Sequence, residues 1–216
     1  MRKQYSTYEK IVESYLERKD GERIVLGMGS GRTATRLLDA CAHIGRNREG
    51  VVFAGTSTET EMALQRHGVA TASMQTTEHI DLYFDGADYV DANGWMIKGY
   101  GGAILQEKIA MCISSLCVIV VPFSKCVPSF ANLYVPVEIV KPSLSLFKSH
   151  LEKNRCAYKI RHSESNVYVT YLGNMIIDVL YQENLLALLD VPGVVAHGLI
   201  PPDKKIEIAI IENPLY

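Results

Sequence analysis

The sequence lacks several features that would place it in a specialised class of protein. The longest apolar run, residues 116–123, is far too short to cross a bilayer. Residues 1–10 contain no apolar core of the kind that signal peptides have. The net charge is −2 and no basic run occurs, so nucleic acid is not an expected partner. We therefore expect a cytoplasmic protein that binds neither membranes nor nucleic acid.

Cysteine and histidine do not occur in the patterns that form disulfides or bind metals. The five cysteines are an odd number, and none stands in a C-x-x-C pattern. The six histidines include no H-E-x-x-H pair. We expect most of the cysteines to be small buried hydrophobic residues, and we expect no metal site.

One stretch, residues 81–108, carries much of the polar chemistry of the chain. Asp85 and Asp88 lie three residues apart in D-G-A-D, directly after a short apolar run that predicts a strand. Lys98 begins K-G-Y-G-G, and Glu107 is expected in the second turn of the helix that follows. Ligands of open α/β sheets bind at the carboxyl ends of strands, where Asp85 is expected. These groups together could transfer protons beside an anionic substrate.

Each part of this stretch also has a simpler interpretation. Asp-Gly is a common turn dipeptide, the glycine-rich loop could be a plain connection, and Glu107 could be a solvated helix residue. Helical spacing favours a more specific role for Glu107, because Ile104 and Met111 lie on the same side of the helix. Glu107 is therefore expected at the border of an apolar stripe, an environment that suits acid–base chemistry.

A second glycine-rich loop, G-M-G-S-G-R-T-A at 27–34, follows a strand expected at 23–26 and begins a helix. Such a loop directs backbone N–H groups and a helix N-terminus towards an anion. A dinucleotide site is disfavoured, because G-x-G-x-x-G would need glycine where Arg32 stands. The next strand, 51–54, also does not end in the acid that would hold a ribose. We therefore expect an anion site and no NAD.

Strands and helices alternate from residue 24 to residue 121, which predicts a mainly parallel sheet. The apolar run 116–121 is typical of a strand buried on both faces. Capping-box patterns predict a helix over 6–19, capped by Ser6, and another that begins at Thr58. A short strand is expected at 69–72.

The pattern changes beyond residue 127. Strands are expected at 134–140, 158–161, 167–170 and 175–180, with helices around 144–151 and 185–189 and a hairpin turn at Gly173-Asn174. A last strand, 206–211, is expected to return to the first domain. The predicted fold class is α/β. A mainly parallel, Rossmann-like domain of residues 1–127 and 203–216 would carry a smaller α+β domain of residues 128–202.

In order and spacing, the motifs D-G-A-D, K-G-Y-G and Q-E-K of this sequence resemble those of the type A ribose-5-phosphate isomerase family. The family's DGAD, KGGG and REK elements correspond to 85–88, 98–101 and 106–108. Further similarities are the loop 30–33, Lys125 after a strand, and the segments 136–140, 173–178 and 192–199. The resemblance covers Ile24 to Ile211. The sequence departs from the family pattern at Arg32, Tyr89, Tyr100, Gln106 and Tyr171.

The resemblance implies interconversion of ribose 5-phosphate and ribulose 5-phosphate through an enediolate, without metal or redox cofactor. It implies that Glu107 is the general base, that Asp85 and Asp88 handle ring opening and hydroxyl protons, and that Lys98 stabilises the developing oxyanion. The residues implied to hold the sugar phosphate are Ser30, Gly31, Arg32, Thr33, Gly86, Ala87, Gly99, Tyr100, Gly101 and Lys125. A homodimer or a dimer of dimers is also implied.

Two other functions remain open at this point. The departures from the family pattern suggest a non-catalytic sugar-phosphate sensor on the same fold. An acyl-CoA-handling enzyme of related architecture could also use a glutamate beside glycine-rich loops. The retention of DGAD, Lys98 and Glu107 together favours the isomerase over both.

Overall fold

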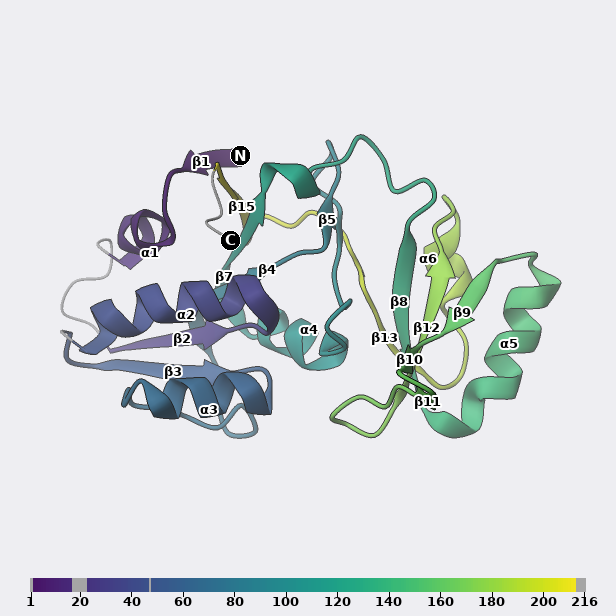
Figure 1. Ribbon diagram of the computed structural model, residues 1–216, viewed down its shortest axis with the longest axis horizontal. Coiled ribbons are helices and arrows are strands. Elements are labelled where there is room, and N and C mark those ends of the chain that lie inside the picture. Colours follow the sequence, from purple (N-terminus) through teal and green to yellow (C-terminus); the bar gives the residue numbers. More distant parts are fainter. Residues whose placement is uncertain (1, 17–22, 47, 213–216) are drawn as a thin grey trace. The chain divides into compact units, whose positions relative to one another are not determined.

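The computed structural model (Figure 1) describes residues 2–16, 23–46 and 48–212. The chain forms two compact units. The first comprises Met1–Ala87, Gln106–Cys126 and Asp203–Tyr216, and the second comprises Asp88–Leu105 and Val127–Pro202. The domain boundaries that we predict from the sequence stay a proposal, and the structure adds that residues 88–105 pack with the second unit.

A six-stranded sheet forms the centre of the first unit. Its strands are β1 (Arg2–Tyr5), β2 (Ile24–Met28), β3 (Val51–Gly55), β4 (Ile80–Gly86), β7 (Ser114–Pro122) and β15 (Ile206–Ile211). Their order is β1-β15-β7-β4-β2-β3, and every neighbouring pair is parallel. The predicted parallel sheet is confirmed, and so is the return of residues 206–211. The polar strand β1 had no sequence signal.

Helices cover this sheet and form its main core. They are α1 (Tyr8–Leu16), α2 (Gly31–Arg46), α3 (Thr58–Arg66) and α4 (Ile104–Cys112), and the short 3₁₀ helix η2 (Phe123–Lys125) follows β7. Ile11, Leu37, Phe53, Phe84 and Val120 belong to one cluster and are fully buried. As predicted for a strand covered on both faces, Cys117–Val121 is fully buried as well.

Local details of the first unit differ from prediction at three places. The cap of α1 is Thr7 rather than Ser6, and its hydroxyl accepts a hydrogen bond of 3.3 Å from the N–H three residues on. Ser57 rather than Thr58 caps α3 in the same way, at 3.2 Å. Neighbouring hydroxyl residues can each serve as a cap, so the pattern locates a cap only to within a residue. Residues 69–72 make one bridge, Phe53 to Thr71, instead of a strand. Residues 17–19 of the first predicted helix lie outside the described part.

The second unit is built on antiparallel sheets. The largest has the order β13-β8-β12-β9. Its strands are β8 (Tyr134–Ile139), β9 (Tyr158–Ile160), β12 (Met175–Leu180) and β13 (Val194–His197). Smaller sheets contain β5 (Tyr89–Val90), β6 (Met96–Ile97) and β14 (Leu199–Ile200), and β10 (His162–Ser163) with β11 (Asn166–Val167). The helices are η3 (Lys141–Ser143), α5 (Leu144–Lys153) and α6 (Leu185–Leu188).

The core of the second unit lies where α5 packs on the four-stranded sheet. Val135, Val137, Phe147, Leu151 and Ile177 are fully buried there in one cluster. The strand predicted at 167–170 is shorter than expected, because only its first residue lies in β11 and Val169 makes a single bridge to Met175. The turn predicted at Gly173-Asn174 is confirmed, with Gly173 at φ +83°.

Candidate active site

Asp85 lies at the carboxyl end of a central strand. β4 continues through Gly86, and Asp85 is in register with Ile119 of β7. The interpretation of D-G-A-D as only a turn is therefore wrong for its first two residues, because the ladder with β7 holds them extended. The Asp85 side chain is buried, with the residue 1% exposed. A carboxylate in such a place needs hydrogen-bond donors that replace water.

Tyr83 supplies one of these donors, which the sequence did not reveal. Its hydroxyl donates to Oδ2 of Asp85 at 2.6 Å, and the N–H of Gly86 donates to Oδ1 at 2.7 Å. Burial raises the pKa of Tyr83 well above its usual value, and the negative charges of Asp85 and Glu107 raise it further. The phenol therefore stays protonated. The only sequence signal is the spacing of two residues, which places Tyr83 and Asp85 on one face of the strand.

The glycine-rich loop 27–34 packs its backbone against Asp85. A Cβ at Gly29 would lie 2.0 Å from Cγ of Asp85, so only glycine fits. The next residue, Ser30, donates its hydroxyl to Oε1 of Glu107 at 2.6 Å. This loop thus contacts Asp85 and Glu107, the two carboxylates of the first unit to which the resemblance assigns proton transfer.

Glu107 is buried in the first turn of α4, rather than in the second turn as expected. It is 5% exposed, and its helix neighbours Ile104 and Met111 are 1% and 6% exposed. The predicted apolar border is confirmed, and the interpretation of Glu107 as a solvated residue is wrong. A buried carboxylate with a hydroxyl donor can accept a proton without first losing a water shell.

Other loop residues of the first unit support these groups. Thr60 donates its hydroxyl to the carbonyl oxygen of Gly29 at 2.8 Å, which ties α3 to the glycine-rich loop. Gly31 has φ +79° where α2 begins, and Thr33 packs against Gly86. Arg32 is exposed. Its contact with phosphate therefore stays a prediction.

The side chain of Lys125 contacts Ala87, the residue that directly follows β4. Lys125 lies in η2, and its Nζ donates to the carbonyl oxygen of Ala87 at 2.6 Å. The residue is half-buried. This hydrogen bond fixes the ammonium group against the backbone, and phosphate binding by Lys125 stays a prediction.

The second unit contains Asp88 and the loop that Lys98 begins. Lys98 is buried, and its backbone N–H donates to the carbonyl oxygen of Gly198 at 2.8 Å. Gly99 has φ +105°, and a Cβ there would lie 2.4 Å from Cγ1 of Ile104. Asp88 accepts a hydrogen bond from the N–H of Tyr100 at 3.0 Å. The loop is therefore a defined structure rather than a plain flexible connection.

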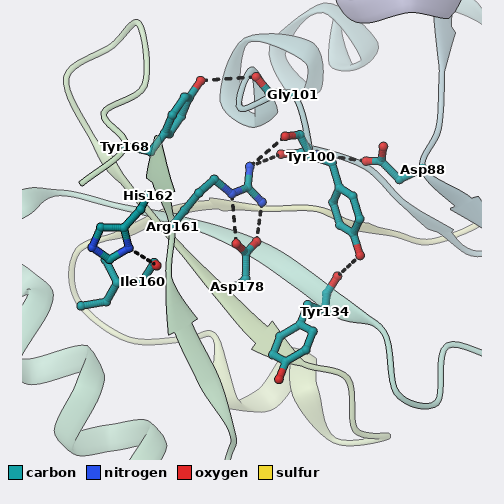
Figure 2. A network of polar contacts seen from close by, with 10 residues as sticks. Asp88, Tyr100, Gly101, Tyr134, Ile160, Arg161, His162, Tyr168 and Asp178 are labelled. Carbon is teal, nitrogen blue, oxygen red and sulfur yellow. Dashed lines mark hydrogen bonds and ion pairs between the residues drawn. The ribbon is translucent and has the colours of Figure 1, made fainter. Parts of the chain in front are cut away.

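Two departures from the family pattern, Tyr89 and Tyr100, contact each other. Their rings meet edge to face, with centroids 6.0 Å apart. The hydroxyl of Tyr100 donates to the carbonyl oxygen of Tyr134 at 3.0 Å (Figure 2). Burial, followed by the neighbouring Tyr89 and Asp88, raises the pKa of Tyr100 to about 12, so this donor persists at neutral pH.

Two further residues of the second unit support the same region. Arg161 carried no recognised sequence signal, whereas Glu138 lies in the segment 136–140 that resembles the family. Arg161 donates to the carbonyl oxygens of Gly99 and Tyr100 (Figure 2). Glu138, 1% exposed, accepts a hydrogen bond of 3.2 Å from the N–H of Leu105 in the first turn of α4. A carboxylate at this end complements the helix dipole.

The side chains of Thr170 and Asn174 also donate to Glu138, at 2.9 and 3.0 Å. Glu138 thus links the P-V-E segment and the Gly-Asn turn to the first turn of α4.

No group of three or more His, Cys, Asp or Glu residues in the described part of the chain is arranged to hold a metal ion. No helix in the described ranges is long and apolar enough to span a membrane. Cys41, Cys117 and Cys156 are buried, as most cysteines were expected to be, whereas Cys112 is exposed.

Comparisons with known proteins agree on one family. The model of the family "Ribose 5-phosphate isomerase A (phosphoriboisomerase A)" matches residues 52–213. A curated ribose-5-phosphate isomerase A of Listeria monocytogenes is 32% identical over 188 residues, which cover 84% of this chain and 83% of the relative.

Solved structures give the same result for the fold. The ribose 5-phosphate isomerase of Plasmodium falciparum is 26% identical, with a TM-score of 0.81 over 94% of this chain and 92% of that one. The ribose 5-phosphate isomerase A of Methanocaldococcus jannaschii is 27% identical, with a TM-score of 0.82 over 93% of each chain.

Proposed function

The chain belongs to the ribose 5-phosphate isomerase A family, and we propose that it interconverts D-ribose 5-phosphate and D-ribulose 5-phosphate. The observation that carries the proposal is the buried Glu107, which accepts a hydrogen bond of 2.6 Å from Ser30 in the unit that also holds the buried Asp85. An aldose–ketose isomerase needs a positioned base and a second group that manages oxygen protons, and these carboxylates suit both tasks.

In the proposed reaction, Glu107 removes the proton from C2 of the open-chain aldose. The electron pair forms the C1–C2 double bond of an enediolate, and negative charge develops on the oxygen of C1. Lys98 stabilises this charge, because a fixed cation contributes most where charge appears during the reaction. Glu107 then returns the proton to C1, while a proton passes from the oxygen of C2 to the oxygen of C1, which leaves a ketone at C2 and a hydroxyl group at C1.

Asp85 and Asp88 are proposed to manage the oxygen protons during ring opening and enediolate formation. Tyr83 and Gly86 support this role for Asp85, because their two donors hold one orientation of its carboxylate. We further propose that the loop Ser30–Thr33, Gly86-Ala87, Gly99–Gly101 and Lys125 bind the sugar and its phosphate. None of these steps uses a metal or a redox cofactor.

Glu107→Gln tests the proposal. Gln keeps the size of the side chain and an oxygen that can accept the Ser30 bond, but it cannot accept the C2 proton. A positioned general base contributes roughly 10²–10⁴-fold to a rate, so we expect kcat to fall by about that factor with the fold retained. Deuterium at C2 of the substrate should also stop exchanging with solvent.

Glu207→Gln is a matched control. Glu207 likewise accepts a hydroxyl hydrogen bond, from Tyr15 at 2.7 Å, in the same unit, and it has no role in the proposed reaction. Its variant should keep the wild-type rate. Wild-type protein that binds pentose phosphate without turnover or C2 exchange would instead be a sensor. An active Glu107→Gln variant would show that another group is the base.

We also propose that the protein acts in the cytoplasm as a homodimer or a dimer of dimers, as the family resemblance implies. Sedimentation velocity at assay concentration gives the oligomeric state directly. A monomer with full activity would contradict the proposed assembly while leaving the proposed chemistry intact.

A further inference from the structure

The side chain of Arg161 joins four acceptor oxygens of three residues in the second unit (Figure 2). Its Nε donates to Oδ2 of Asp178 at 3.0 Å, and its Nη2 pairs with Oδ1 of the same carboxylate. Nη1 donates to the carbonyl oxygens of Gly99 and Tyr100, at 2.8 and 3.1 Å. The side chains of Arg161 and Asp178 are only 14% and 18% exposed, so water competes little for these bonds.

One peptide group connects this guanidinium to Asp88. The carbonyl oxygen of Gly99 and the N–H of Tyr100 belong to the same planar unit. The oxygen accepts from Arg161, and the N–H donates to Oδ2 of Asp88 at 3.0 Å. Rotation of this peptide would break both bonds, so the guanidinium and the carboxylate orient opposite ends of one rigid group.

We propose that Arg161 is a positioning residue for Asp88, acting through the Gly99–Tyr100 peptide group. A cation at the carbonyl end polarises the peptide and strengthens its N–H as a donor to the carboxylate. Asp178, in β12, fixes the direction of the guanidinium by pairing with two of its nitrogens. The inference rests on the proposed function in one respect, namely that Asp88 manages oxygen protons of the substrate.

The composition of the loop explains why it needs such a support. K-G-Y-G-G contains three glycines in five residues, and glycine loses more backbone freedom on ordering than any other residue. The guanidinium binds two successive carbonyl oxygens of this loop and a carboxylate at once. A lysine ammonium has no planar fork and cannot reproduce this arrangement.

The alternative is that Arg161 and Asp178 merely stabilise the antiparallel sheet. The two roles can be distinguished by how often the enediolate returns to substrate and how often it goes on to product. Ring opening precedes both deuterium loss and product formation, so a slower ring opening lowers both rates and cancels in their ratio. A poorly placed Asp88 additionally slows the oxygen-proton transfers that lead from the enediolate to product, so the intermediate returns to substrate more often. A general loss of stability would lower both processes in proportion.

The experiment compares wild type, Arg161→Lys, Arg161→Met and Asp178→Asn with ribose 5-phosphate deuterated at C2. Product formation and loss of deuterium from the remaining substrate are measured together. We expect product formation to fall roughly 10- to 100-fold in Arg161→Met, the effect of losing a charge-assisted hydrogen bond, with more deuterium lost per product formed. Arg161→Lys should not restore the rate, and Asp178→Asn should lie between wild type and Arg161→Met.

Arg48→Lys is the control, because Arg48 also donates to a backbone carbonyl oxygen, that of Leu16, at 2.8 Å in the first unit. It should leave both rates unchanged. An unaltered ratio of deuterium loss to product in Arg161→Met, or full activity of Arg161→Lys, would overturn the inference.

A second measurement keeps the inference separate from the proposed function. Exchange of the Tyr100 amide hydrogen, followed by NMR, should be faster in Arg161→Met than in wild type, whether or not the wild type turns over substrate. Equal exchange would overturn the inference even if the protein proves to be an active isomerase. A wild type without turnover would refute the proposed function alone.

Discussion

Replacement of Tyr83 by phenylalanine should show how much the hydrogen bond to Asp85 contributes to activity. The change removes one oxygen atom and keeps the buried ring, so no large cavity forms. The lost bond is 2.6 Å long and joins two residues that are 0% and 1% exposed. Water therefore has little access to replace the missing donor.

The expected loss of free energy follows from the carboxylate acceptor and from a donor that the variant keeps. A hydrogen bond to a charged group contributes about 1.5–3 kcal/mol. Asp85 keeps the N–H donor of Gly86 at 2.7 Å, so we expect a loss near the lower end of this range. Since 1.36 kcal/mol corresponds to a factor of ten in rate, kcat/KM should fall roughly tenfold if the whole loss is expressed in the transition state. The free energy of unfolding should fall by a similar amount, about 1.5 kcal/mol.

Tyr15→Phe is the matched control for this variant. Tyr15 is also buried, and its hydroxyl donates at 2.7 Å to a carboxylate, that of Glu207, in the same unit. The Glu207 side chain is 30% exposed and also pairs with Lys3, so its loss of one donor should lower the free energy of unfolding by less than about 1 kcal/mol. Its kcat/KM should equal that of the wild type.

Steady-state kinetics and urea unfolding of the two variants decide the matter. A Tyr83→Phe protein that is less stable but has wild-type kcat/KM would refute the reasoning, because the bond would then serve only folding. Equal kinetic losses in both variants would refute it as well, because the effect would not depend on Asp85.

Three further outcomes are expected. Arg32→Ser should raise KM with little change in kcat, since Arg32 stands in an anion-binding loop; an unchanged KM would mean that the side chain only faces solvent. Gly29→Ala should lower kcat sharply while the protein still folds, because its Cβ would lie 2.0 Å from Cγ of Asp85 and must displace that carboxylate; wild-type kinetics in this variant would show that the orientation of Asp85 is unimportant. Treatment with EDTA should leave the isomerase rate unchanged, and a loss that a divalent ion restores would contradict the proposed chemistry.

Local patterns in the sequence were enough to predict much of the fold. Residues 117–121 of the apolar run 116–121 are fully buried, as the composition of the run predicts. Asp85 stands at a strand end because an apolar run precedes it, and Glu107 is buried because Ile104 and Met111 share its side of α4. These features follow from neighbours within a few residues, where the periods of strands and helices apply.

The sequence by itself determined the parallel core and the strand end at which Asp85 stands. Only the tertiary structure decided how its polar groups are oriented. β1 is polar and gains its place by pairing with β15 at the other end of the chain. Arg161 reaches Gly99, and Glu138 reaches Leu105, from segments far away in the sequence. Such bonds depend on which buried donors and acceptors the fold brings within about 3 Å, and no local period encodes that distance.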